Sequence, residues 1–334
     1  MRPQWTVIPL LWCLTAAADE KPAFIFPVDC QYGVDCFIQF YFDHDPTPGY
    51  SDYKCRQQTY DGHTGTDIRL VNLPQMAAGV KVIAAASGTV FATRDGVADT
   101  YLDPARFKAI NKIGLGNAVV IQHEDGWRTT YGHMKNGSLM VQKGDQVKQG
   151  QSLGEIGLSG LTEFPHMHFQ VRHHGKLIDP FIGKPDRTKC GDTGSSQWLE
   201  TADNNITYFP GLLLDYGFNN KPPVDYRSIE TGYFNKGADS RSEYLFFWVR
   251  FIGLTVGDQA TLSFIAPNGE LIEEQTFPAL KRNKEQQLYY IGIDNPAIYP
   301  GQTGRWQGRV RLQRTSLPAI DKQFDYTAEA SERR

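Results

Sequence analysis

Two short histidine-containing segments, a hundred residues apart, most constrain how this chain of 334 residues can fold. The first runs from His63 to Asp67 as His-Thr-Gly-Thr-Asp, and the second is His166-Met167-His168. In an extended strand, alternate side chains leave the same face about 6–7 Å apart, so His166 and His168 can serve one reaction centre. The imidazoles of His63 and His168 with the Asp67 carboxylate form a ligand set that suits zinc and leaves a fourth position for water. The sequence therefore predicts that the two segments meet at a catalytic metal site.

Glycine-punctuated segments between and around these motifs carry a family resemblance. They are 62–67, 116–126, 131–134, 141–151 and 166–169. In this order they closely resemble the zinc endopeptidases of family M23, the lysostaphin or LytM type, which cut peptides of peptidoglycan. The resemblance covers about residues 55–185. It implies an all-β, LytM-type domain built on an antiparallel β-sheet.

The resemblance also implies site residues. It makes His63, Asp67 and His168 the ligands of one zinc ion (Zn2+) per chain, which would polarise the scissile carbonyl and lower the pKa of bound water. It implies catalytic roles for His166 and His133. We favour His166 as general base, because it lies two residues from a ligand on the same strand face, and His133 as the group that stabilises the tetrahedral intermediate. The sequence leaves open which histidine takes which role.

Other histidines are interpreted as ordinary surface residues. His44 lies among acidic residues and prolines, which favours an exposed loop over a cap on the active-site groove. His173 and His174 precede a glycine and are typical of an exposed hairpin. Because neighbouring side chains leave opposite faces of a strand, we do not expect this pair to share a metal.

Domain organisation follows from shifts in composition. Short runs of β-branched and apolar residues alternate with glycine turns from about residue 78 onward, which predicts an all-β chain. A polar, turn-rich stretch over 185–205 indicates a boundary. A helical insertion is expected within 99–113. The expected parts are a signal peptide over 1–18, a lead-in segment over 19–54, a peptidase domain over 55–190 and an immunoglobulin-like β-sandwich over 200–334.

The first residues are typical of an exported protein. A basic start, an apolar run and small residues up to Ala18 predict a cleaved leader. An uncleaved anchor is the alternative, but the apolar run is shorter than the roughly 20 residues that span a bilayer. After cleavage we expect no stable transmembrane segment.

The four cysteines beyond the leader are even in number, which favours disulfides in an exported protein. Of the three possible connectivities, we favour Cys30 with Cys36 and Cys55 with Cys190. A thiolate zinc site is the alternative, and the absence of any Cys-x-x-Cys pair argues against it.

These observations predict a periplasmic or secreted zinc metalloendopeptidase that hydrolyses peptide stems or cross-bridges of peptidoglycan. D,D-endopeptidase activity is favoured over Gly-Gly cleavage, because an export signal and disulfides suit a Gram-negative periplasm. A formal net charge of −3 without a basic run argues against a nucleic-acid partner. One alternative is a catalytically inactive, M23-like activator of another wall hydrolase. Another is a wall-binding protein in which the second domain is the working part.

Overall fold

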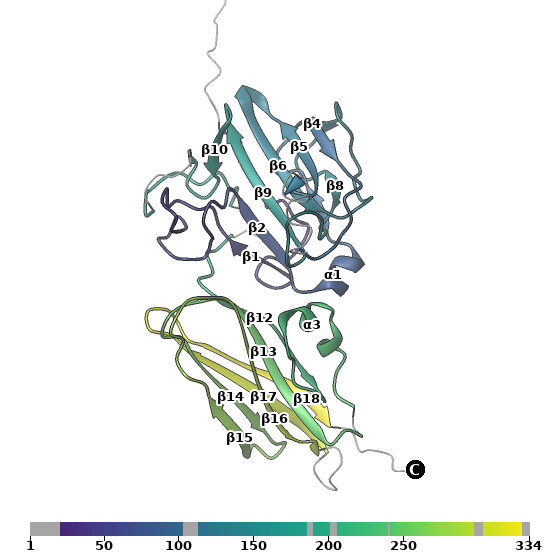
Figure 1. Cartoon of the computed structure of the whole chain (residues 1–334), viewed down its shortest axis with the longest axis vertical. Coiled ribbons are helices and arrows are strands. Elements are labelled where there is room, and N and C mark those ends of the chain that lie inside the picture. The colour runs from purple at the N-terminus through teal and green to yellow at the C-terminus, as the bar shows by residue number, and fades with distance from the viewer. Residues whose placement is uncertain are drawn as a thin grey trace, which may run out of the picture.

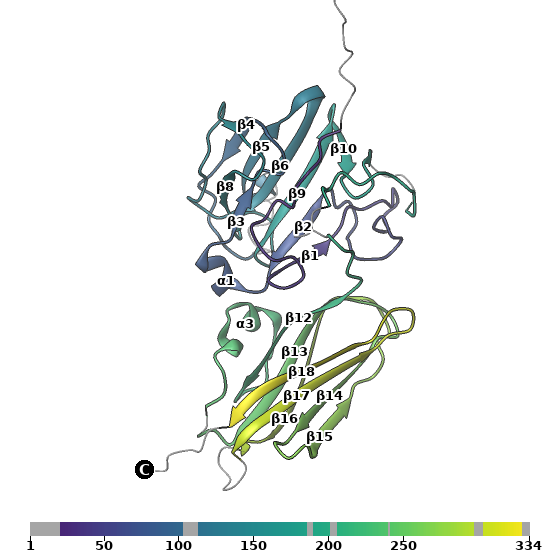
Figure 2. The ribbon, with the colours of Figure 1, turned by 180° about the vertical axis from the view of Figure 1, so that it is seen from behind.

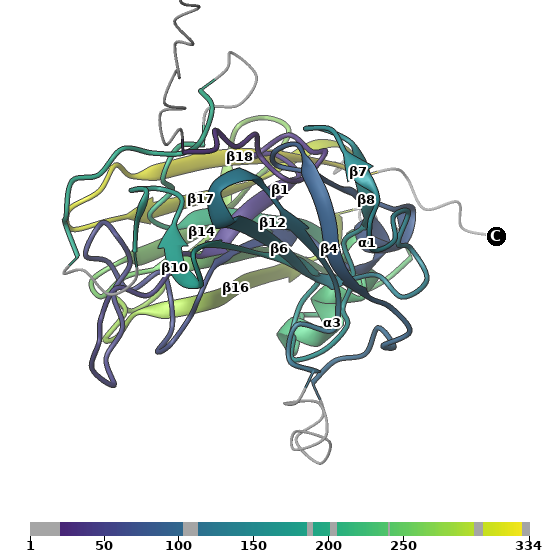
Figure 3. The same ribbon diagram turned by 90° about the horizontal axis from the view of Figure 1, so that it is seen from above.

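The computed structural model describes residues 21–102, 113–185, 190–200, 206–239, 241–296 and 303–328. It is almost entirely β and consists of two units stacked along the long axis, with the N-terminal unit above the C-terminal one in Figure 1. Viewed from above, the first unit overlies the second (Figure 3). The expected signal peptide and residues 103–112 of the expected helical insertion lie outside the described residues. Within the described parts of the chain, no helix has the length and apolar character needed to cross a bilayer.

The N-terminal unit is built on one antiparallel sheet of nine strands. Its main path has the order β1-β2-β9-β6-β5-β4-β7, with β10 beside β9 and β11 beside β10. The strands are β1 (Cys36–Phe40), β2 (Thr66–Leu70), β4 (Gly88–Arg94), β5 (Asn117–Gln122), β6 (Trp127–Met134), β7 (Gln146–Val147), β9 (His166–His173), β10 (Lys176–Asp179) and β11 (Lys184–Pro185). A second, two-stranded sheet pairs β3 (Lys81–Ile83) with β8 (Ser152–Glu155). The short helices are α1 (Leu73–Ala78) and η3 (Glu124–Gly126).

Strand β9 shows how the sequence divides the sheet into two faces. Met167, Phe169 and Val171 belong to the hydrophobic core of this unit. Because side chains alternate along a strand, His166 and His168 lie on the opposite face. The alternation of apolar and polar residues thus places the histidines on a strand that the core holds in position.

The lead-in segment is part of this unit. Strand β1 is an edge strand that pairs with β2, and the buried side chains of Phe24 and Tyr41 pack into the same core. His44 corrects an expectation, because it is 1% exposed rather than lying on an exposed loop. Its Nε2 lies 2.7 Å from Oδ2 of the buried Asp179 at the end of β10. The segment is therefore held to the sheet by burial, strand pairing and a buried polar contact.

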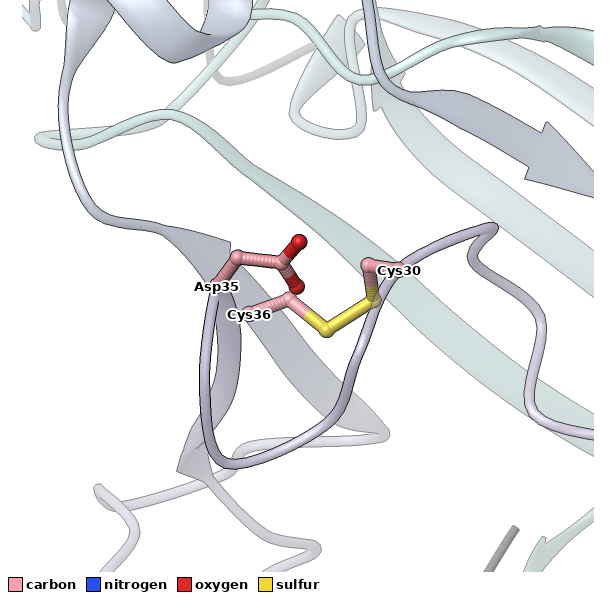
Figure 4. Close-up of side chains that lie close together, drawn as sticks. All are labelled: Cys30, Asp35 and Cys36. Carbon is pink, nitrogen blue, oxygen red and sulfur yellow. A yellow bond between two sulfur atoms is a disulfide. The ribbon is translucent and has the colours of Figure 1, made fainter. Parts of the chain in front are cut away.

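Two disulfides confirm the favoured cysteine pairing. Cys30 is bonded to Cys36 at the start of β1, as Figure 4 shows. Cys55 is bonded to Cys190, 135 residues later. All four sulfur atoms are consumed, so a thiolate zinc site is not formed by these cysteines. Asp35 lies beside the first disulfide, but the oxidised pair leaves no thiolate to act with it (Figure 4).

The C-terminal unit is a β-sandwich of seven strands. One sheet has the order β12-β13-β16 and the other β15-β14-β17-β18. The strands are β12 (Leu212–Asn219), β13 (Tyr244–Leu254), β14 (Gln259–Ile265), β15 (Leu271–Thr276), β16 (Lys284–Asp294), β17 (Gly304–Gln313) and β18 (Ile320–Ala328), and the short helices are α3 (Tyr226–Glu230) and η4 (Tyr233–Asn235). Buried residues of both sheets, such as Phe247 and Phe264, form one core. In constant-type immunoglobulin domains the fourth strand joins the first sheet, whereas here the fourth strand, β15, pairs with the third, β14.

The two units meet at an interface with an ionic and an apolar part. Glu230 Oε1 accepts hydrogen bonds of 2.6 Å from both Arg69 Nη2 and Arg250 Nη1. Arg69 lies on β2 of the first unit, whereas Glu230 and Arg250 belong to the second, and both arginines are fully buried. Phe37 of β1 packs with Leu214 and Ile252 of the sandwich in a small apolar cluster. Helix α1 of the first unit and helix α3 of the second face each other at one edge of this interface (Figures 1 and 2).

Candidate metal centre

Antiparallel pairing of β2 with β9 forms the floor of the centre. The register places Asp67 opposite His168. Oδ1 of Asp67 lies 2.7 Å from Nδ1 of His168. Both side chains are at most 4% exposed, so the expected contact between the two distant motifs is present in a buried environment.

His63 completes a group of three from the loop that precedes β2. Its Nε2 lies 3.1 Å from Asp67 Oδ1 and 3.3 Å from His168 Nδ1. Its Nδ1 lies 2.6 Å from the main-chain oxygen of Tyr41 in the lead-in segment. The ring of Tyr60 stacks on the His63 imidazole, with centroids 4.4 Å apart. Nitrogen and oxygen atoms of His63, Asp67 and His168 therefore converge on one point.

His166 and His133 lie beside this group of three. His166 Nε2 is 3.7 Å from Asp67 Oδ1. His133 belongs to the neighbouring strand β6, and its ring centroid is 4.5 Å from that of His166. The backbone of His133 has φ 56°, a left-handed conformation that non-glycine residues rarely adopt. The structure thus brings together all five side chains that the sequence singled out.

Backbone carbonyls set the protonation pattern of three of the histidines. Nδ1 of His63 faces the oxygen of Tyr41, Nδ1 of His133 that of Ser159 at 2.7 Å, and Nδ1 of His166 that of Phe164 at 2.9 Å. A carbonyl oxygen only accepts hydrogen bonds, so each Nδ1 carries the hydrogen and each neutral ring keeps its lone pair on Nε2.

That pattern tests whether the residues fit a metal. The lone pair of neutral His63 Nε2 is directed toward the Asp67 carboxylate, and two acceptors repel one another unless a proton or a metal cation lies between them. Two imidazole nitrogens and one carboxylate oxygen are a ligand set that zinc prefers. A carbonyl that fixes the far nitrogen of a ligating histidine is also usual in zinc sites. The donor set of His63, Asp67 and His168 therefore fits zinc.

Burial and neighbouring charges together set the pKa values of these groups. Burial alone would lower the pKa of His63, but the Asp67 carboxylate outweighs it and raises the pKa. Burial alone would raise the pKa of Asp67, but the neighbouring His63 and His166 lower it well below its ordinary value. Burial lowers the pKa of His166, and burial together with His166 and His168 lowers that of His133 well below its ordinary value. His133 and His166 are consequently held in the uncharged form that accepts a proton.

Gly65 shows why the first motif has a glycine between its two polar ends. A Cβ atom at this position would lie 2.6 Å from Nε2 of His168 and would also overlap the main-chain oxygen of Phe169. Any larger residue would displace His168 or part the strands. The glycine allows the loop that carries His63 to pass close over β9.

A cleft beside the five side chains contains residues that sequence reasoning missed. Aromatic rings of Phe40, Tyr60 and Phe164 line it in the N-terminal unit. Glu285 and Gln286 of strand β16 line it from the C-terminal unit. No local pattern near the motifs indicates the contribution of β16, because it depends on how the two units pack.

The His173-His174 pair departs from expectation. Strand β9 ends at His173, and His174 has φ 47°, so the rings do not diverge and their centroids lie 4.2 Å apart. His173 Nε2 lies 3.3 Å and His174 Nε2 3.8 Å from carboxylate oxygens of Asp125. The expectation that alternation separates these neighbours was wrong, because the strand has already turned. The group of three lies on the surface, at the far end of β9 from His166 and His168.

Comparison with known proteins places this domain in a family. Residues 61–180 match Peptidase family M23. The lipoprotein NlpD/LppB homolog of Pseudomonas aeruginosa is 36% identical over 109 residues, which are 33% of this chain and 31% of that protein. The murein hydrolase activator NlpD of Escherichia coli is 34% identical over 74 residues, 22% of this chain and 19% of that protein. The DD-carboxypeptidase/endopeptidase Mpg of Neisseria meningitidis serogroup B is 31% identical over 133 residues, 39% of this chain and 28% of that protein.

The matches concern the domain and not the whole chain. This chain covers less than a third of the length of each of these relatives. The matched region contains all five clustered side chains, from His63 to His168. The domain at residues 61–180 belongs to peptidase family M23.

Proposed function

We propose that this chain is a zinc metalloendopeptidase that hydrolyses peptide cross-links of peptidoglycan. The observation that carries the proposal is the convergence of His63 Nε2, Asp67 Oδ1 and His168 Nδ1, which lie within 2.7–3.3 Å of one another inside an M23-family domain. His133 and His166 lie beside this group with their acceptor nitrogens available. Three ligands with two further imidazoles suit a hydrolytic centre better than a structural one, because structural zinc sites use four protein ligands.

His63, Asp67 and His168 would hold the metal. When bound there, zinc supplies Lewis acidity, which polarises a carbonyl and acidifies water. The Tyr41 carbonyl orients His63 through its Nδ1–H. Burial of the three ligands excludes competing solvent from most of their surface.

His166 and His133 would handle the protons. His166 Nδ1 is held by the Phe164 carbonyl, with Thr162 Oγ1 at 3.0 Å, so its Nε2 is free to take a proton from the attacking water. His133 is held in the same way by Ser159, so it would need a second proton on Nε2, taken up from solvent, to donate a hydrogen bond to the developing oxyanion. The near-symmetric tethering of the two rings is compatible with the reverse assignment, so we propose both as catalytic residues and His166 as the favoured base.

For the bond cleaved, we propose a D,D cross-link, and for the location, the periplasm or the exterior of the cell. Support for the bond comes from the relative named DD-carboxypeptidase/endopeptidase, which is 31% identical over the matched region. Support for the location comes from the leader-like sequence at 1–18 and from two disulfides, which persist in oxidising compartments. We further propose that the peptidase domain extends over 55–190 and the sandwich domain over 200–334.

A second function is activation of a separate wall hydrolase without catalysis. It is favoured by the relative named murein hydrolase activator, which is 34% identical over 74 residues. The presence of all five side chains in one buried cluster supports the enzyme instead, because an activator needs neither the ligands nor the two extra imidazoles.

One experiment separates the two functions. The exported chain is purified, its zinc content is measured by elemental analysis, and purified peptidoglycan is digested and resolved by mass spectrometry of the muropeptides. The enzyme predicts about one zinc per chain and loss of cross-linked dimers, reversed when a chelator removes the metal. Intact dimers after treatment with zinc-loaded protein, together with faster digestion when a wall amidase is added, would support the activator.

A further inference from the structure

Two carboxylates from different units line the cleft beside the candidate centre. Glu163 comes from the loop that precedes β9, and Glu285 from strand β16 of the sandwich. Partial burial raises the pKa of Glu285, and the nearby Glu163 carboxylate raises it further. Among the residues that the structure describes, neither carboxylate has a salt-bridge partner. Two exposed carboxylates of separate units thus line one cleft, and no described basic side chain forms an ion pair with either.

Two amide side chains of the same cleft have unused hydrogen-bonding groups. Gln39 is 2% exposed, and its Oε1 accepts a hydrogen bond from Arg69 Nη1, which fixes the orientation of the amide. Its Nε2 has no partner within the described residues, and the same is true of Oε1 of Gln286. Buried polar groups are nearly always paired. One donor and one acceptor without partners are complementary to the C=O and N–H groups of a peptide backbone, which could reach them once the side chains that cover these atoms move aside.

We propose that this cleft holds the substrate peptide next to the scissile bond, and that Glu163 and Glu285 together recognise a free primary amine on that peptide. An ammonium group has three N–H donors and no acceptor, so it can bond to both carboxylates at once. Charge-assisted hydrogen bonds of this kind are stronger than neutral ones. The inference rests on the proposed function, because it names the substrate class of the same site.

The sandwich unit gains a role from this inference. Strand β16 carries Glu285 and Gln286 to the cleft, and the buried contacts among Arg69, Glu230 and Arg250 hold the sandwich against strand β2. Arg69 is two residues from Asp67 on the same strand. The second unit therefore acts as a specificity wall of the active site rather than as a separate binding module.

The test compares two synthetic substrates, each made of two stem peptides joined by a D,D cross-link, that are identical except for one lysine, whose ε-amine is free in the first and acetylated in the second. Binding to the zinc-loaded full chain is measured by fluorescence anisotropy near neutral pH, and hydrolysis of both peptides is followed by mass spectrometry. We expect about tenfold weaker binding of the acetylated peptide, because one charged hydrogen bond contributes about a factor of ten or more. In the double variant Glu163→Gln with Glu285→Gln, the two affinities should differ by less than about twofold.

Two controls test whether the preference for the free amine depends on Glu163 and Glu285. Glu273→Gln, on the exposed strand β15, should retain the tenfold preference, and thermal unfolding should show that the double variant is folded. Equal binding of the two peptides by the unaltered chain, no binding of either, or an undiminished preference in the double variant would overturn the inference. Preferential binding without hydrolysis would uphold amine recognition and refute the endopeptidase. Equal binding of both peptides together with hydrolysis of both would refute amine recognition and uphold the endopeptidase.

Discussion

Replacing Glu230 by Gln should destabilise the protein more than any other single change at the interface of the two units. Glu230 Oε1 accepts from Arg69 Nη2 and Arg250 Nη1, each at 2.6 Å, and its side chain is 3% exposed. Burial lowers the pKa of Arg69 to about 10, which still leaves the guanidinium charged at neutral pH. Glutamine keeps the shape but removes the negative charge between two fully buried cations.

The expected loss in the free energy of unfolding follows from the contacts that Arg69 and Arg250 keep after the substitution. After the change, the described carboxylate that still lies within ion-pair distance of Arg250 is that of Asp215, with Oδ2 at 3.6 Å from Nη2. Arg69 keeps its neutral contacts with Gln39 and with the main-chain oxygen of Leu70. Removing one partner of a buried ion pair costs about 3–5 kcal/mol, so we expect a loss of that size in the free energy of unfolding.

Urea unfolding followed by tryptophan fluorescence measures this loss. Because the chain has two units, the transition should be checked with a second probe before a single free energy is assigned. Glu273→Gln is the matched control, since an exposed substitution should change the free energy by less than about 0.5 kcal/mol. A loss below about 1 kcal/mol for Glu230→Gln would refute the reasoning, because it would mean that water or a rearranged carboxylate compensates both arginines.

Three further predictions concern the site, a disulfide and pH. Asp67→Ala should abolish both zinc retention, measured by elemental analysis, and hydrolysis. His166→Ala should keep the zinc and lose about 10²–10⁴-fold in turnover. Full turnover in the His166→Ala variant would exclude His166 as the general base. Replacing both Cys55 and Cys190 by Ser should lower the free energy of unfolding by about 2–5 kcal/mol, since the bond closes a loop of 135 residues; an unchanged urea midpoint would contradict this. Burial raises the pKa of Asp215 to about 6 from 3.8, so its contribution to stability is full below pH 4 and declines as the pH rises through 6, by up to about 3 kcal/mol. Asp215→Asn should remove that decline, and parallel stability curves for the two proteins between pH 4 and 6 would count against it.

Much of the site could be predicted because its residues follow strand periodicity. His166 and His168 alternate with apolar neighbours, which placed both histidines on one face of the strand. The same reasoning had no signal for strand β15, where every residue is exposed and apolar spacing is absent. It also gave no warning of the left-handed backbone of His133, whose N–H donates to the main-chain oxygen of Leu115.

Features that depend on packing between distant segments lay beyond sequence reasoning. His44 is buried because Asp179, 135 residues later, lies beside it, and composition around His44 indicated only a polar loop. The cleft wall from β16 depends on how two separately patterned units meet. Local patterns thus identified what each strand carries, whereas long-range contacts decide what each loop residue faces.

The carbonyl of Tyr41 has a practical consequence for anyone who shortens this protein. The family match begins at residue 61, yet the group that aligns His63, the edge strand β1 and one half of a cystine all come earlier in the chain. A fragment trimmed to the recognised family limits would keep every expected ligand and still lose the support that orients one of them. Truncated reagents should therefore start near residue 21, and weak metal uptake by a shorter piece would report on the trimming rather than on the full chain.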